Sequence, residues 1–414
     1  MPWRRRLLLL ALTASLVVLA GLIPKAEPPV PVSVVSVGSP EKSVLTPEVL
    51  RARAAQHTLL PTVPECPSIP QQISTWTPEQ RVAQQLVSYW PPYTPNLPPL
   101  GGVMVTRVHG PDIDSVRRFT RALSVPARTP APLLVTDQEG GMVTRLVDPQ
   151  LEVFASNAAI SRLERGVQRT GDQGETFAAA LTRAGIQANL APVVDVATRA
   201  NPVISGLGRA YSSDPEVVTA HATAFVLATQ QQGRAATLKH FPGHGMVTLD
   251  SHQTLPTSDI DWPTLWRTHL YPYRTLFSHP DVRHDLLMVM TGHVRFSQLD
   301  NDAPASLSPT ITTTLLRQQL GFDGVIITDA LGMGALSGPI EERVVRALGA
   351  GADFALLEAP YHEQIPLIID TLVARYDAEP ARWWANAQSL RRIITLKAAL
   401  GLVGTDANGC ITLP

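Results

Sequence analysis

Seven short apolar runs, separated by longer segments with helical spacing, are the strongest constraint on the fold of this 414-residue chain. Each run is too short for a helix and too continuous for a half-exposed strand, which is typical of parallel strands buried on both faces. Helical spacing follows in segments such as 175–184, 215–232 and 308–320. Repeated strand–helix units predict a (β/α)8 barrel or a doubly wound sheet. The apolar runs are residues 102–106, 133–136, 188–194, 235–238, 286–290, 325–328 and 354–357.

A polar residue of a catalytic type follows most of these runs. In a barrel the carboxyl ends of the strands share one mouth, so such side chains would converge, whereas in a doubly wound sheet they would spread along an edge. No dinucleotide-binding glycine fingerprint follows any run, which weakens the second alternative. We therefore predict an α/β fold with a (β/α)8 TIM-type barrel as a single catalytic domain. The strand-end residues are Asp137, Asp195, Lys239, His240, His293 and Asp329.

The N-terminal residues have the pattern of an export signal. Three arginines at positions 4–6 precede an apolar run over residues 7–23, which predicts a signal or signal-anchor at 1–23. Cleaved and uncleaved forms both remain open, and both place the body of the protein outside the cytoplasm. We expect a Pro-rich linker at 24–72, the barrel at 73–402 and a C-terminal tail at 403–414.

Charge and cysteine content limit the possible partners. The formal net charge of −1 argues against nucleic acid as a main partner, because nucleic-acid binding normally requires a basic surface. Cys66 and Cys410 are the two cysteines, and in an exported protein they can pair or remain two free thiols. A bridge would close a very long loop and stabilise the fold by about 4–5 kcal/mol or more in the chain-entropy model.

Five titratable side chains lie within fifteen residues that also contain proline and glycine, which predicts an active-site loop. Asp250 lies two residues before His252 and can hold its ring, making the imidazole a proton shuttle, although a solvated Asp/His pair is the simpler alternative. The same residues could be drawn as zinc ligands. No HExxH helix is present and a lysine lies beside them, so we predict no metal and no cofactor. The five are Lys239, His240, His244, Asp250 and His252.

Asp329, at the end of the run 325–328, suits a nucleophile or a cation stabiliser, with a helix cap as the structural alternative. Asp137 adds an acceptor at another strand end, beside the donors Lys239 and His240. Polar groups of mixed sign at a barrel mouth fit a polyhydroxylated ligand, because each hydroxyl both donates and accepts.

Three segments, 133–141, 239–252 and 321–329, resemble glycoside hydrolase family 3, in the branch of β-N-acetylglucosaminidases that act in peptidoglycan recycling. The resemblance covers roughly residues 75–402. It implies a retaining double displacement with Asp329 as the nucleophile and His252, oriented by Asp250, as the general acid/base in place of the usual second carboxylate. It also implies a set of sugar-binding residues, namely Asp137, Arg145, Arg209, Lys239 and His240.

Three departures from the family pattern concern the subsites more than the reaction. Met142 stands where the family often has arginine, and Ala330 stands where a second aspartate is frequent. Residues 208–211 match the corresponding family motif only loosely.

We predict an exported, monomeric exo-β-N-acetylglucosaminidase that removes terminal GlcNAc from peptidoglycan- or chitin-derived fragments. Its partner would be this carbohydrate, without nucleic acid, and membrane contact would come through the N-terminal segment. The alternatives are a β-N-acetylglucosaminide phosphorylase, a β-glucosidase on the same scaffold, and a non-catalytic sugar-binding or wall-anchored protein. The phosphorylase remains open because a neutral histidine base repels phosphate less than a carboxylate does.

Overall fold

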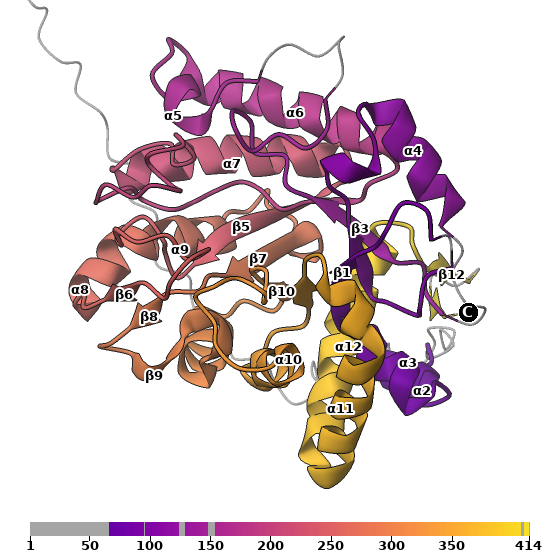
Figure 1. Cartoon of the computed structure of the whole chain (residues 1–414). Coiled ribbons are helices and arrows are strands. Elements are labelled where there is room, and N and C mark those ends of the chain that lie inside the picture. The colour runs from indigo at the N-terminus through magenta and orange to yellow at the C-terminus, as the bar shows by residue number, and fades with distance from the viewer. Residues whose placement is uncertain (1–65, 95, 124–128, 148–153, 407–409, 414) are drawn as a thin grey trace, which may run out of the picture. The chain divides into compact units, whose positions relative to one another are not determined.

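Eight parallel strands form the centre of the structure (Figure 1), a computed structural model that describes residues 66–94, 96–123, 129–147, 154–406 and 410–413. The sheet order is β10-β7-β5-β4-β3-β2-β1-β11. A parallel bridge between Ile327 and Phe354 joins the two ends, and Thr328 N donates to Phe354 O over 3.0 Å. The predicted (β/α)8 barrel is confirmed. Its strands are β1 (Leu86–Tyr89), β2 (Gly102–Met104), β3 (Leu133–Thr136), β4 (Ala188–Asn189), β5 (Ala235–Phe241), β7 (Leu287–Thr291), β10 (Val325–Thr328) and β11 (Ala355–Leu357).

Each of the seven apolar runs overlaps one barrel strand, and the sequence pattern missed β1. The run at 188–194 is a strand only at Ala188–Asn189, because Pro192 lacks the N–H that a continued ladder needs. The chain returns to the sheet at Val193, which bridges Lys239. Strand β1, with the sequence LVSY, has too short an apolar stretch to be recognised, although Ser88 is fully buried.

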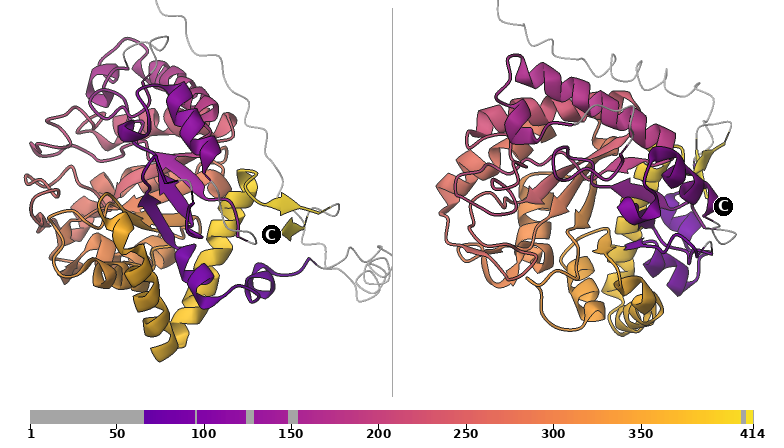
Figure 2. Two further views of the ribbon diagram at one scale, coloured as in Figure 1. Left: turned by 45° about the vertical axis from the view of Figure 1, so that its right-hand side comes forward. Right: turned by 45° about the horizontal axis from the view of Figure 1, so that its top comes forward.

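Helices surround the barrel, as the second view of Figure 2 shows. The helix predicted from 215 begins there, with Asp214 accepting from Glu216 N over 2.8 Å and Pro215 in the first turn. The segment predicted from 308 is a π-helix, η6, and Ser308 Oγ accepts from Ile311 N. The main helices are α4 (Ile113–Ala122), α6 (Gly166–Ala184), α7 (Pro215–Gln231), α9 (Tyr271–Phe277), η6 (Thr310–Gln319), α10 (Ile340–Gly349), α11 (Ile365–Ala378) and α12 (Ala381–Ala399).

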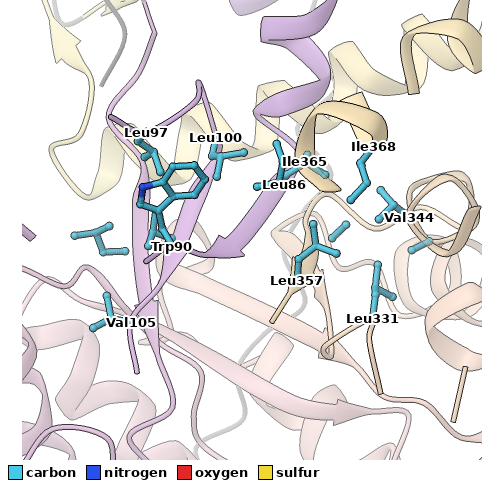
Figure 3. Packing of buried hydrophobic residues seen from close by; sticks show 14 of the residues in the cluster. Leu86, Trp90, Leu97, Leu100, Val105, Leu331, Val344, Leu357, Ile365 and Ile368 are labelled. Atoms are coloured by element: carbon cyan, nitrogen blue, oxygen red, sulfur yellow. The ribbon is translucent and has the colours of Figure 1, made fainter. Parts of the chain in front are cut away.

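The connection from β1 to β2 departs from the regular pattern, because its described residues form no helix. Trp90, Leu97 and Leu100 from this connection are buried in the same cluster as Ile365 and Ile368 of α11 (Figure 3). The connection therefore covers its part of the barrel with apolar side chains instead of a helix.

The two ends of the barrel unit are tied together. Cys66 and Cys410 form a disulfide, which decides between the two alternatives, with Cα atoms 5.3 Å apart. Gln72 of α2 (Ile69–Ile73) donates to Ile411 O over 2.9 Å and accepts from Leu413 N over 3.0 Å. Helix α2 begins in the segment predicted as linker, and the hairpin of β12 (Gly404–Thr405) and β13 (Ile411–Thr412) lies in the predicted tail.

The signal or signal-anchor segment and residues 24–65 of the linker lie outside the described residues. Within the described part of the chain, no helix has both the length and the apolarity needed to cross a membrane.

Replacing Cys66 by serine should lower the free energy of unfolding by an amount on the order of 5 kcal/mol, because the bridge closes a loop with a sequence separation of 344. Urea unfolding of the variant and of the oxidised wild type measures the difference. Turnover at room temperature should be retained, since the bridge joins a segment before β1 to a segment after α12 and involves no barrel strand. An unchanged unfolding midpoint would contradict a stabilising role.

Candidate active site

The carboxyl ends of the strands surround a cavity of about 310 Å³. Seven of the eight predicted site residues line this cavity. The eighth, Asp250, does not line it but is hydrogen-bonded to His252, which does. The convergence expected of strand-end residues in a barrel is therefore observed, although the structure does not by itself assign their roles. The seven lining residues are Asp137, Arg145, Arg209, Lys239, His240, His252 and Asp329.

A buried carboxylate, Glu139, holds two cations at the floor of the cavity. Arg209 binds it with two hydrogen bonds of 2.8 Å, and Lys239 Nζ lies 2.6 Å from its Oε1. Lys239 Nζ also donates to Asp137 over 2.6 Å. Burial alone would raise the pKa of Glu139, but the two cations hold that pKa well below its usual range. Burial would lower the pKa of Lys239, yet Asp137 and Glu139 raise it, so Lys239, Glu139 and Arg209 are all ionised at neutral pH.

Glu139 is a site residue that the sequence reasoning missed. It lies inside the recognised segment 133–141, two residues after Asp137, and that spacing puts both carboxylates on the same side of an extended chain. A second acid at this spacing was the available signal. Its importance follows from its neighbours Lys239 and Arg209, which come from distant parts of the sequence.

Asp195, directly after the third apolar run (188–194), orients His240. Its Oδ2 lies 2.7 Å from His240 Nδ1, and its Oδ1 accepts from the backbone N–H of His244 over 2.6 Å. Burial would raise the pKa of Asp195, but the nearby His240 ring lowers it below its ordinary value. With Nδ1 fixed in this way, His240 Nε2 lies 3.4 Å from Arg209 Nη2, on the cavity side.

Asp329 follows β10 directly. Its backbone N–H donates to Thr291 O of β7 over 2.9 Å, and its Oδ1 accepts from the N–H of Ala330 over 2.8 Å. Burial would raise the pKa of Asp329, but His240, His293 and the Ala330 N–H lower it to about 2. Asp329 is therefore a carboxylate at neutral pH and can attack a carbon or stabilise a cation.

His252 and Asp250 form a pair at the mouth of the cavity. His252 Nδ1 lies 2.7 Å from Asp250 Oδ1, which also accepts from the His252 backbone N–H over 2.8 Å. Burial would raise the pKa of Asp250, but these two hydrogen bonds lower it, so the carboxylate is ionised and fixes the ring. The His252 side chain is 59% exposed, and its other ring nitrogen is available to a ligand.

The loop that follows β10 holds the His252 loop in place. Gly334 N donates to His252 O over 3.0 Å, and Ala335 N donates to Ser251 O over 3.1 Å. His244 supports the same loop, because its Nε2 lies 2.9 Å from Ser251 Oγ. The residues that carry Asp329 and the residues that carry His252 are therefore connected through backbone hydrogen bonds.

Arg145 lines the cavity, and its backbone N–H donates to Gln138 Oε1 over 2.9 Å. Among the described residues, no group of three or more His, Cys, Asp or Glu is arranged to hold a metal ion.

Comparison with known proteins identifies the family. Residues 98–396 match the glycosyl hydrolase family 3 N-terminal domain, which is more than half of the chain. The chain belongs to glycosyl hydrolase family 3. The predicted resemblance and the prediction of a glycoside hydrolase are confirmed.

Three relatives place this family 3 chain more closely. It is 34% identical to beta-hexosaminidase LpqI of Mycobacterium tuberculosis over 310 residues, covering 72% of this chain and 76% of that protein. The solved LpqI structure superposes with a TM-score of 0.69 at 28% identity, over 80% and 97% of the two chains. The solved structure of a family 3 β-N-acetylglucosaminidase from a Paenibacillus species superposes with a TM-score of 0.70 at 29% identity. The match covers 82% of this chain and 65% of that chain. Beta-hexosaminidase A of Pseudoalteromonas piscicida is 34% identical over 62% of this chain, which spans only 46% of that relative.

Replacing Glu139 by glutamine should lower the free energy of unfolding by about 3 kcal/mol or more, because Lys239 and Arg209 then remain buried without their shared anion. The matched control is Glu342→Gln, which breaks an exposed ion pair with Arg375 and should cost less than about 1 kcal/mol. Urea unfolding measures both variants. An equal loss of unfolding free energy in the two variants would show that the buried ion pairs of Glu139 stabilise the fold no more than an exposed ion pair does.

Stability should fall as the pH drops from about 6.5 to about 4. Burial lowers the pKa of His244 and of His269 to about 4, from 6.5 in an ordinary environment. Within this window the unfolded chain binds protons that the folded chain does not, so lowering the pH favours unfolding. Asp329 contributes with the same sign only below about pH 4. Urea unfolding at several pH values measures how steeply the free energy of unfolding falls with pH. This fall should be shallower in His269→Gln than in the wild type, and an unchanged slope would contradict burial of the histidine as its cause. His284→Gln, which changes an exposed histidine, is the control.

Proposed function

We propose that the chain is an exported, retaining exo-β-N-acetylglucosaminidase that removes GlcNAc from the non-reducing end of peptidoglycan- or chitin-derived fragments, acting as a monomer. The observation that carries the proposal is the pairing of an ionised Asp329 with the His252–Asp250 pair at one cavity, on two loops joined by backbone hydrogen bonds. The beta-hexosaminidase and β-N-acetylglucosaminidase relatives support this choice of sugar.

In the proposed first step the terminal sugar binds at the charged floor. Asp137, Lys239, Arg209 and His240 offer acceptors and donors of fixed position to its hydroxyls. Asp329 attacks the anomeric carbon while His252 gives its proton to the leaving oxygen, and the glycosidic bond breaks. The products of this step are the free alcohol and a glycosyl ester on Asp329.

In the second step His252, now neutral, takes a proton from water, and the resulting hydroxide attacks the anomeric carbon from the side that the alcohol left. Asp329 departs as a carboxylate, and its low pKa of about 2 makes it a good leaving group. Two inversions return the original configuration. Asp250 stays ionised and supports the imidazolium that forms before the first step and after the second.

Export is supported by two features. The disulfide between Cys66 and Cys410 fits an oxidising compartment. Residues 1–23 combine a basic start with an apolar run, which is the composition of a signal or signal-anchor.

The proposal is tested by the hydrolysis of 4-nitrophenyl β-GlcNAc against 4-nitrophenyl β-glucoside in phosphate-free buffer. We expect clear preference for the GlcNAc glycoside, and Asp329→Ala should remove nearly all turnover, on the order of 10⁴-fold or more, because no other nucleophile replaces it. A preference for glucoside, a requirement for phosphate or full activity of Asp329→Ala would each overturn the proposal.

The role of His252 predicts a leaving-group effect. His252→Ala should lose little activity on 2,4-dinitrophenyl β-GlcNAc in the first step, since that leaving group needs no proton, and about 100-fold or more on alkyl β-GlcNAc glycosides. Single-turnover kinetics with both substrates measure this, with His284→Ala as a control outside the site. Losses of equal size on both substrates would argue against His252 as the acid.

A further inference from the structure

The mouth of the cavity carries exposed apolar side chains that the reaction described above does not use. Met142 is 71% exposed and Leu207 is 39% exposed, and both line the cavity. Leu249 is 50% exposed and directly precedes Asp250 in the chain. Single exposed apolar residues are ordinary on a protein surface, but a group of them at the rim of a binding site marks a contact surface.

The backbone fixes the positions of Met142 and Leu207. The neighbouring residues Gly141 and Gly208 have φ values of +56° and +65°, which favour glycine. A Cβ at either glycine would approach the side chain of Ser156, to 2.8 Å from Gly141 and 2.9 Å from Gly208. Both rim segments therefore pack against the same residue, so Met142 and Leu207 occupy adjoining parts of one rim.

Backbone hydrogen bonds also hold the segments that carry Met142 and Leu207. Gly141 N donates to Phe154 O over 3.1 Å, and Ala158 N, in α5 (Asn157–Ile160), donates to Gly208 O over 3.0 Å. These bonds attach both rim segments to the residues around the start of α5. The rim thus has a defined backbone conformation before any ligand binds, which reduces the entropic cost of using it as a contact surface.

Leu249 is joined to this rim through the buried side chain of Asn201. The Asn201 Nδ2 donates to Val247 O over 2.8 Å and to Leu249 O over 3.4 Å, while its Oδ1 accepts from Val203 N and Ile204 N over 2.9 and 2.8 Å. The loop that leads to Leu207 and the loop that carries Leu249 and Asp250 are therefore held together.

The polarity of the site changes sharply from floor to rim. The floor contains the ionised groups of Glu139, Lys239 and Arg209, which suit sugar hydroxyls, whereas Val203 and Ile204 continue the apolar lining towards Leu207. A group bonded to the oxygen that His252 protonates would lie in the same cavity that Met142 and Leu207 line. The rim can gain free energy only from apolar surface that the leaving group brings to it.

We propose that Met142 and Leu207 form an apolar leaving-group subsite, and that the enzyme prefers β-GlcNAc glycosides whose leaving group presents an alkyl or aryl face. This inference rests on the proposed function, because it requires the leaving group to lie beside His252.

The test uses two non-hydrolysable probes, methyl and hexyl 1-thio-β-GlcNAc, as competitive inhibitors of 4-nitrophenyl β-GlcNAc hydrolysis. They share the same sugar and differ only in apolar length, so the ratio of their inhibition constants reports contact with the rim. We expect hexyl to bind about 10-fold or more tightly than methyl, as partial burial of five additional methylenes predicts.

The double variant Met142→Ser/Leu207→Ser should bring this ratio to within about 3-fold of one, with the affinity for the methyl probe unchanged. Leu367→Ser, which changes a 52% exposed leucine on α11, is the matched control and should keep the wild-type ratio. A wild-type ratio near one, or an unchanged ratio in the double variant, would overturn the subsite while leaving the proposed function intact. Absence of any 4-nitrophenyl β-GlcNAc turnover would overturn both.

Discussion

The site depends on one buried carboxylate that binds two cations. Without Glu139, Arg209 and Lys239 would lie buried without their shared anion, and a buried cation that loses its partner costs several kcal/mol. With it, the floor has donors and acceptors of fixed position, which the proposed sugar substrate would need. Asp137 completes the group by accepting from Lys239, and it is the more exposed of the two carboxylates.

The barrel brings these groups together from distant parts of the sequence, and loop hydrogen bonds set the relation between the reacting groups. Asp329 is held at the end of β10 by Thr291 of the neighbouring strand. The residues after it bind the backbone of Ser251 and His252, so the loop that carries Asp329 and the loop that carries His252 are held together. A displacement of either loop would therefore change the position of Asp329 relative to His252, which the proposed reaction requires to be fixed.

Much of the fold could be predicted from the sequence, because parallel strands buried on both faces leave continuous apolar runs. The prediction was incomplete where another constraint decided the structure. Pro192 ended β4 early, β1 has too few apolar residues to stand out, and Trp90 with its neighbours replaced a helix by packing. The pairing of Cys66 with Cys410 depended on where the two ends of the barrel unit lie, which no local pattern encodes.

The candidate site shows the same division. Strand-end positions located Asp137, Lys239 and Asp329 correctly at one mouth, because the topology of a barrel guarantees that convergence. Glu139 and the apolar rim could not be found in this way, since their significance lies in contacts between residues far apart in the chain.

The central claim is that Asp329 becomes covalently attached to the sugar. Peptide mass spectrometry of the His252→Ala variant, quenched in acid during turnover of 2,4-dinitrophenyl β-GlcNAc, tests it most directly, because the first step then proceeds while the second lacks its base. The account predicts one GlcNAc residue on the peptide that carries Asp329, and a sugar attached to any other residue would contradict it.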